Sequence, residues 1–344
     1  MIADVVRPAE LGAGDTAAWR AIQQSGDRID NPFLTPEFSQ VVGTVRRRAR
    51  VAVLRDGPAT TYFPFERRAF GVVRPMGAGV SDCEGLIVAG PLDVDGQDLL
   101  RACDIRLWRF NHLLGDQATV LAPGCPQALS PLIDLDGGFD AYLADRHIVS
   151  RSLVSTAERK ARKLAREVGE LRFSADDLDH AHVERLLLWK REQYRRTGVK
   201  DVLAAPDTAR ILHRLADARG DDFSGVLSVL HAGDEPVAVH LGLRTRTALA
   251  WWLPAYDPAY ARYSPGVTLI LRIAEWAAGT GVRWIDLGKG EETYKDRLQN
   301  AESYVADGIL ARPYARRSFE LQRQIRPYAR RLRPGGDRTE IASA

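Results

Sequence analysis

The chain of 344 residues has few cysteines and no long apolar segment. Its three cysteines, Cys83, Cys103 and Cys125, lack the paired spacing of a metal site, and a sparse, odd count is typical of a reducing compartment. No basic-then-apolar leader opens the sequence, and no apolar run approaches ~18 residues, the length that spans a bilayer. The sequence therefore predicts a cytoplasmic protein without a metal.

Charge of one sign is also missing, because 48 Lys and Arg nearly balance 45 Asp and Glu. The net charge of +3 gives no global argument for nucleic-acid binding. Basic residues nevertheless gather at 151–172 and 312–338. The first run predicts an amphipathic helix, either a solvated linker between domains or a basic wall beside a phosphate-bearing ligand. The second is a basic C-terminal helix or tail at 316–344, solvated or in contact with anionic lipid or a membrane-bound synthase.

The length favours two domains, with a division near residue 150. In the first part, helices are predicted at 17–23, 36–45 and 99–108, and a hairpin at 51–54 and 60–65. In the second part, strands are predicted at 171–173, 225–231 and 236–243, and helices at 180–195 and 208–218.

The most informative stretch is 247–295, where a strand at 247–253 precedes a helix at 266–280 and a strand at 283–287. A strand–helix–strand unit of this length is a crossover, so the two strands are expected to be parallel. Ser264 suits the helix N-cap and Pro265 the first turn. The helix N-terminus is a ready anion site, and Arg262 lies just before it. A short helix at 292–299 and a strand at 303–310 follow.

Several motifs carry a family resemblance. They are Tyr-Ser-Pro-Gly at 263–266, Asp-Leu-Gly at 286–288 with Tyr-Lys at 294–295, the basic stretch at 159–164, and the turn at 82–85. With the element order of the second part, they resemble GNAT-superfamily acyltransferases of the CelD/BcsL type, which are linked to bacterial exopolysaccharide synthesis. The resemblance covers about residues 15 to 310. That family is related to the Fem-type aminoacyltransferases.

The resemblance implies an α/β fold with a mixed sheet and two tandem GNAT-like (acyl-CoA N-acyltransferase) domains. Residues 1–150 would be a degenerate domain and residues 151–315 the acyltransferase domain. The implied activity is N-acyl transfer from acetyl-CoA, or another acyl-CoA, to an amino group. The acceptor would be a small molecule or glycan, an amino sugar or sugar nucleotide of exopolysaccharide or cell-envelope synthesis, with the synthesis machinery at the membrane as a partner.

Donor binding is expected at the start of the 266–280 helix and in the segment after the last crossover strand. The candidates are Arg262, Tyr263, Ser264, Gly266, Val267, Lys289 and Lys295. The usual family loop, Q/R-x-x-G-x-G/A, is not matched at 262–267, where a proline stands in the position of the first glycine.

Acyl transfer to an amine needs a base and a proton donor for the leaving group. His240 and Asp286 are the candidate bases, and Tyr294 is the candidate donor to the leaving thiolate; no acyl-enzyme is expected. A core histidine, a strand-end cap and a solvated helix are the respective structural alternatives. Acceptor binding is assigned to Asp82, Trp251, Tyr256 and Glu292, with a core role open for the tryptophan and a solvated turn for Asp82.

Two other functions remain open from the sequence. A Fem-like enzyme would use aminoacyl-tRNA as donor and would present a basic groove, of which the 151–172 helix is the one indication. A non-catalytic regulator would bind a nucleotide such as cyclic di-GMP through arginines.

Overall fold

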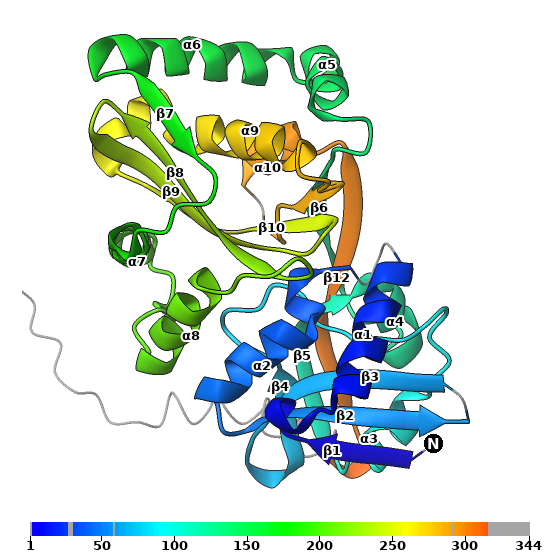
Figure 1. Ribbon diagram of the computed structural model, residues 1–344. Helices are drawn as coiled ribbons and strands as arrows, with labels where there is room; N and C mark the ends of the chain where they lie inside the picture. Colours follow the sequence, from blue (N-terminus) through cyan, green and yellow to red (C-terminus); the bar gives the residue numbers. More distant parts are fainter. Residues whose placement is uncertain (1, 27–29, 58, 291, 316–344) are drawn as a thin grey trace, which may run out of the picture.

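The computed structural model describes residues 2–26, 30–57, 59–290 and 292–315 (Figure 1). The predicted basic segment at 316–344 lies outside the described residues. Among the residues that are described, no helix has the length and apolarity to cross a bilayer.

The described strands form one mixed sheet of 12 strands. In spatial order they are β1 (Ile2–Val6), β2 (Ala49–Asp56), β3 (Ala59–Arg67), β4 (Val72–Pro75), β5 (Leu107–Leu114), β12 (Ala301–Ala311), β6 (Gln127–Asp134), β11 (Trp284–Asp286), β10 (Ala248–Tyr256), β9 (Glu235–Arg244), β8 (Ser224–Ala232) and β7 (Leu171–Ser174). The first and second parts of the chain thus share a continuous sheet.

The centre of the sheet is where the two parts of the chain interleave. The last strand, β12, lies antiparallel between β5 and β6, and β6 pairs antiparallel with β11. Strand β6 therefore carries residues of the first part into the sheet of the second. Helix α5 (Phe139–Val149) also contacts helices α6, α9 and α10 of the second part. The division into domains at residue 150 remains a prediction. The pairing of β5 and β6 with β12, and of β6 with β11, joins the residues before and after this position in one sheet.

Figure 1 labels the helices that pack around this sheet. Besides α5, the first part has α1 (Ala13–Ser25), α2 (Pro36–Val45), α3 (Gly96–Ala102) and α4 (Gly115–Leu121), and the second has α6 (Arg151–Glu167), α7 (His180–Thr197), α8 (Pro206–Ala216), α9 (Pro265–Ala278) and α10 (Thr293–Leu298). The helix predicted at 99–108 was wrong beyond Ala102, because residues from Leu107 onward pair with β12 as strand β5.

Two apolar cores lie on opposite faces of the second-part strands. Leu269 and Ile273 of α9 pack with Ile285 and Leu249 on one face. On the other face, Leu186 of α7 packs with apolar residues that include those of α2 from the first part. Successive strand residues point to opposite faces, so Asp286 points away from Ile285 and from α9. This alternation places Asp286 and the side chains that face α9 on opposite faces of the sheet.

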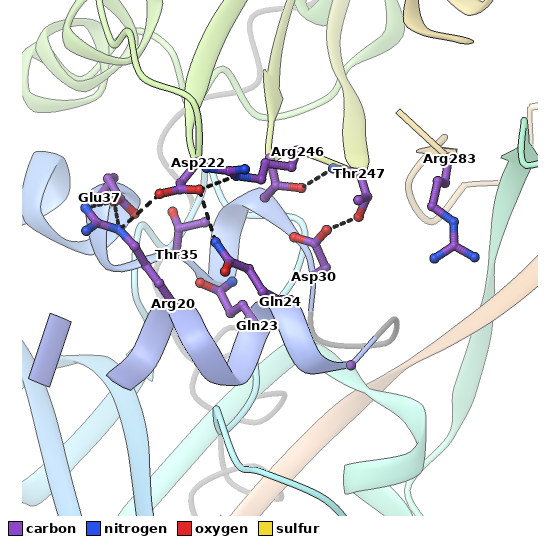
Figure 2. A pocket seen from close by; sticks show the side chains of 12 residues that line it. Arg20, Gln23, Gln24, Asp30, Thr35, Glu37, Asp222, Arg246, Thr247 and Arg283 are labelled. Atoms are coloured by element: carbon purple, nitrogen blue, oxygen red, sulfur yellow. Dashed lines mark hydrogen bonds and ion pairs between the residues drawn. The ribbon is translucent and has the colours of Figure 1, made fainter. Parts of the chain in front are cut away.

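A polar pocket of about 240 Å³ lies where α1 meets loops of the second part (Figure 2). Asp222 is its centre: it accepts hydrogen bonds from Gln24 Nε2 at 3.1 Å and Arg246 Nε at 2.6 Å, and it lies 3.8 Å from Arg20 Nε. The Thr247 hydroxyl donates to Asp30 across the same junction. These contacts join the two parts of the chain, and we interpret the pocket as a structural contact between them.

Candidate active site

The N-terminus of α9 has an unusual backbone. Ser264 has φ 52° and ψ 52°, the left-handed region that costs a non-glycine residue roughly 1–2 kcal/mol. Its position as the N-cap residue is confirmed, but its side chain makes no cap hydrogen bond to the helix. Instead, the Ser264 hydroxyl accepts a hydrogen bond from Lys160 Nζ at 2.7 Å. The basic helix α6 is thereby fastened over the start of α9.

A cavity of about 240 Å³ opens at this point, between α6, α9 and α10. We call it the donor-side cavity; its lining residues are Ser152, Leu153, Thr156, Ala157, Lys160, Ser264, Val267, Thr293, Tyr294 and Arg297. The lining contains two cationic side chains, four hydroxyl groups besides that of Tyr294, and no carboxylate. Together with the positive end of the α9 dipole, this composition suits an anionic ligand such as phosphate.

Only some of the residues predicted to bind the donor line this cavity. Ser264 and Val267 line it, whereas Arg262 and Tyr263 do not. The Tyr263 ring is 1 % exposed, and its hydroxyl donates to Glu167 Oε2 at 2.7 Å. The Arg262 guanidinium lies 4.7 Å from the centre of that ring and 3.7 Å from the same carboxylate oxygen. Lys160 therefore occupies the place expected for Arg262, and only its membership of the basic run at 159–164 marked it in the sequence.

The parallel pairing expected for the crossover is confirmed, and it is short. Strand β11 pairs with β10 from Ala248↔Trp284 to Ala250↔Asp286. Strand β10 then continues to Tyr256 without β11 beside it, and its pairing with β9 is irregular between Ala250 and Leu253. The two strands therefore separate at their carboxyl ends, the position at which open α/β sheets bind ligands.

Three aromatic side chains occupy the α9 side of this opening. The His240 ring is fully buried and stacks on Trp251 with 4.3 Å between ring centres. Trp251 Nε1 donates to the Tyr294 hydroxyl at 3.2 Å. The imidazole fits because residue 242 is glycine: a Cβ there would lie 2.4 Å from His240 Cε1.

The protonation of these groups bears on the predicted roles. Burial lowers the pKa of His240 to about 3, so the imidazole is neutral at physiological pH and a weak proton acceptor. Burial raises the pKa of Tyr294 to about 12, so its hydroxyl keeps the proton that a leaving thiolate would need.

Asp286 lies at the last β10–β11 pair, on the face opposite α9. Its Oδ1 accepts from Ser130 Oγ at 2.8 Å and from the Gly288 N–H at 2.9 Å, and its Oδ2 accepts from Asn31 Nδ2 at 3.3 Å. Asp286 thus caps the turn after β11 and is also held by two residues of the first part of the chain. Burial is the main reason that its pKa is raised above the usual value.

Asp82, from the turn at 82–85, is brought next to Asp286. A Cβ placed on Gly288 would lie 3.8 Å from Asp82 Oδ2, so the carboxylate is beside the end of β11. Burial, followed by the nearby Asp286 carboxylate, raises the pKa of Asp82 to about 7 against the opposing effect of Lys295, Lys190 and Lys289. The structure therefore joins a predicted substrate residue and a predicted base in one carboxylate pair.

The lysines predicted to bind the donor lie beside this pair and not among the residues lining the donor-side cavity. Lys295 Nζ donates to the Gly288 carbonyl at 3.1 Å and lies 3.0 Å from Glu292 Oε2. Lys289 Nζ donates to the Asn111 carbonyl at 2.7 Å. The glycine at position 290 leaves room for the Lys295 ammonium group, because a Cβ there would lie 2.7 Å from Lys295 Nζ.

The remaining predicted acceptor residues are more dispersed. The Glu292 side chain is 56 % exposed, Tyr256 is 39 % exposed at the end of β10, and Trp251 is buried. Gly266 lies in the first turn of α9, where a Cβ would be 3.8 Å from the Tyr256 ring.

A second cavity, of about 510 Å³, adjoins Asp286 between the two parts of the chain. Asn31, Pro32 and Cys83 of the first part line it together with Trp284. Its lining includes no lysine or arginine. Asp286 thus lines a space that the two parts of the chain form jointly.

Comparison with known proteins agrees with this architecture. Residues 151–296 match the family model described as the acetyltransferase (GNAT) domain. The structure of FemX is similar over 92 % of this chain and 99 % of that chain, with 10 % identity and a TM-score of 0.56. The C-terminal domain of a putative lysylphosphatidylglycerol synthetase from Agrobacterium fabrum is similar over 90 % and 97 %, with 12 % identity and a TM-score of 0.53.

A conserved protein of unknown function from Bacteroides thetaiotaomicron is similar over 90 % of this chain and 100 % of that chain, with 10 % identity and a TM-score of 0.55. No curated protein sequence matches the chain. At these identities the structural likenesses establish the fold alone, and the α/β fold with a mixed sheet that was expected from the sequence is confirmed. Residues 151–296 thus match a GNAT acetyltransferase domain, and such a domain implies N-acyltransferase activity.

Proposed function

We propose that the enzyme transfers an acyl group from acyl-CoA, with acetyl-CoA as the simplest donor, to the amine of an acceptor. The observation that carries this proposal is the opening between β10 and β11. The cationic donor-side cavity lies on its α9 side, and the Asp82–Asp286 pair lies toward the opposite face. A donor and an amine that approach from the two faces would meet at this opening.

The donor-side cavity supports binding of the coenzyme phosphates. Lys160 and Arg297 supply positive charge, and the α9 N-terminus supplies main-chain N–H groups. The coenzyme brings the activated thioester; the protein orients it. Peptide groups of β10 beyond Ala250 are not paired with β11, so this edge is available to hold the thioester arm.

The carboxylate pair supplies the base. An acceptor ammonium gives its proton to the Asp82–Asp286 pair, and the free amine attacks the thioester carbonyl carbon. The C–N bond forms, the C–S bond breaks, and Tyr294 gives its proton to the departing sulfur. The nitrogen then loses its second proton to solvent, and a proton from solvent restores the Tyr294 hydroxyl. We assign the base to the carboxylates in preference to His240, because a group whose pKa is near 7 is the better acceptor at neutral pH.

The family resemblance supports the choice of acceptor. Motifs shared with the CelD/BcsL-type proteins favour an amino sugar or sugar nucleotide of exopolysaccharide or cell-envelope synthesis. In this proposal, residues 1–150 are a degenerate domain that serves the acceptor side. Asp82, Asn31 and Ser130 come from that segment and surround Asp286, directly or through hydrogen bonds.

A second candidate donor is aminoacyl-tRNA, and one observation favours it. Helix α6 exposes a row of basic side chains beside the donor-side cavity, namely Arg159, Arg162, Lys163 and Arg166. Such a row suits a nucleic-acid backbone, and binding through it would weaken steeply as salt is added. The acetyltransferase match at 151–296 favours either enzyme over a non-catalytic nucleotide-binding regulator.

Isothermal titration with acetyl-CoA tests the donor assignment. Micromolar binding by the wild type, weakened about tenfold to a hundredfold in a Lys160→Met variant, would support it, since a bond to a charged group contributes about 1.5–3 kcal/mol. Lys163→Met is the matched control, because this lysine lies on the same helix but does not line the cavity. No binding of acetyl-CoA by the wild type would contradict the proposal and direct the search to aminoacyl-tRNA.

A further inference from the structure

Asp82 has charged neighbours but no contact partner. Its carboxylate accepts no hydrogen bond and forms no ion pair within 4.0 Å among the described residues. It nevertheless interacts electrostatically with the Asp286 carboxylate and with the ammonium groups of Lys295, Lys190 and Lys289. A partly buried carboxylate without hydrogen-bond partners is costly, and a ligand that donated a hydrogen bond to Asp82 would remove that cost.

The three lysines differ in how fully they are engaged. Lys289 Nζ contacts the Asn111 carbonyl and the Asp307 carboxylate, and Lys295 Nζ contacts the Gly288 carbonyl and Glu292.

Lys190 Nζ makes one hydrogen bond within the described residues, to the Pro254 carbonyl at 3.1 Å. An ammonium group has three N–H donors, so Lys190 can still bind an anion.

The position of Lys190 places it at the same opening. It lies on α7, and Pro254 belongs to the part of β10 that has already left β11. Its ammonium group interacts with Asp82, Glu292 and Lys295, and burial lowers its pKa. Lys190 is therefore a cation held near the carboxylate pair that the acyl-transfer chemistry itself does not require.

We propose that the acceptor carries an anionic group, a phosphate or a carboxylate, close to its amine, and that Lys190 binds this group while Asp82 receives the ammonium. This inference rests on the proposed N-acyl transfer and specifies its substrate class. An acceptor without an anionic group would leave Lys190 without its ligand. An acceptor with an anionic group would pair that group with Lys190 and its ammonium with Asp82. One charge-assisted contact in a partly buried site gives a preference of roughly tenfold to a hundredfold.

The test compares three acceptors with acetyl-CoA as donor: glucosamine, its phosphate ester on the primary hydroxyl, and the corresponding amino uronic acid. The wild type should acylate at least one of the acidic acceptors with a KM at least tenfold below that for glucosamine. The acidic acceptor that gains more identifies phosphate or carboxylate as the group bound. Lys190→Met should abolish this preference, with the dissociation constant of acetyl-CoA unchanged.

Two further variants separate charge from folding. Lys190→Arg should retain part of the preference, and Lys200→Met, which removes an exposed lysine just beyond α7, should retain all of it. Equal use of the three acceptors by the wild type, or a preference that survives Lys190→Met, would overturn the inference and leave N-acyl transfer intact. Failure to bind acetyl-CoA in titration would instead contradict the proposed function itself.

Discussion

Lys160 Nζ donates a hydrogen bond to Ser264 Oγ at 2.7 Å, and the two residues are 104 positions apart in the chain. This contact fixes the basic helix α6 to the residue from which α9 begins. Because Ser264 is in the left-handed backbone region, the helix starts from a strained position directly beside the donor-side cavity. Such strain is often retained where a loop must present its groups to a ligand.

Ser264→Gly should separate strain from binding. Glycine accepts a positive φ without cost, so we expect the free energy of unfolding to rise by about 1 kcal/mol, offset in part by the lost hydrogen bond. Acetyl-CoA binding should weaken, because the residue that positions Lys160 is gone. Urea unfolding and titration measure the two effects. Ser264→Ala is the control: it loses the hydroxyl and keeps the strain, so a gain in its stability would contradict this explanation.

Asp82→Asn should change the pH dependence of catalysis. Wild-type kcat/KM for an amine should rise with pH and level off above about 7, as the Asp82–Asp286 pair loses its proton. The variant should be roughly a hundredfold slower or more and should lack that rise. A pH–rate profile with the wild-type shape in Asp82→Asn would remove this carboxylate from proton transfer.

His240→Phe should keep the rise in kcat/KM near pH 7. The phenyl ring can preserve the stacking on Trp251, and the neutral imidazole has no proton to exchange in this pH range. Activity should stay within about tenfold of the wild type, since no base is removed. Loss of the rise near pH 7 in this variant, with the protein still folded, would return His240 to the role of base.

Glu84→Gln should remove a pH dependence of stability. Glu84 is 5 % exposed, and burial raises its pKa from 4.5 to about 8 although the Asn111 and His112 N–H groups donate to it. The folded state then holds a proton that the unfolded state has released. Between about pH 4.5 and 8, this group lowers the free energy of unfolding by up to about 1.4 kcal/mol per pH unit as pH rises.

The glutamine variant has no such proton. Its unfolding curves should therefore be less sensitive to pH from 5 to 8, and it should be more stable than the wild type above about pH 8. Chemical unfolding at a series of pH values checks this. Parallel pH dependences in the two proteins would mean that Glu84 is ionised in the fold at lower pH.

Local sequence patterns predicted most of the second part of the chain. The helix expected at 266–280 is α9, and the strands expected on either side of it are β10 and β11 in parallel. Their apolar spacing and bounding glycines are local signals. The first part was harder: Leu107 and Trp108, the first residues of β5, were read as the end of a helix, because the strand pairs with residues of β12 about 200 positions later.

The candidate site was predictable to a lesser degree. Asp286 and Asp82 were each noticed for their position in a turn or strand end, but nothing local predicts that they lie together. Their proximity depends on β6 and β12 being inserted at the centre of the sheet, a long-range pairing. Lys190 was missed because a lysine on an amphipathic helix usually faces solvent. Arg262 was favoured by sequence proximity to α9, and its attraction to Glu167 takes it elsewhere.

The most direct test of the account is acetyl transfer from labelled acetyl-CoA to the phosphate ester of glucosamine, by the wild type and by the Asp82→Asn, Asp286→Asn double variant. We predict labelled N-acetyl product with the wild type at neutral pH. In the double variant, the rate should fall at least a hundredfold, with unchanged acetyl-CoA affinity, because only the proton acceptors have been removed. Transfer at the wild-type rate by the double variant, or no transfer to any amine by the wild type, would contradict the account.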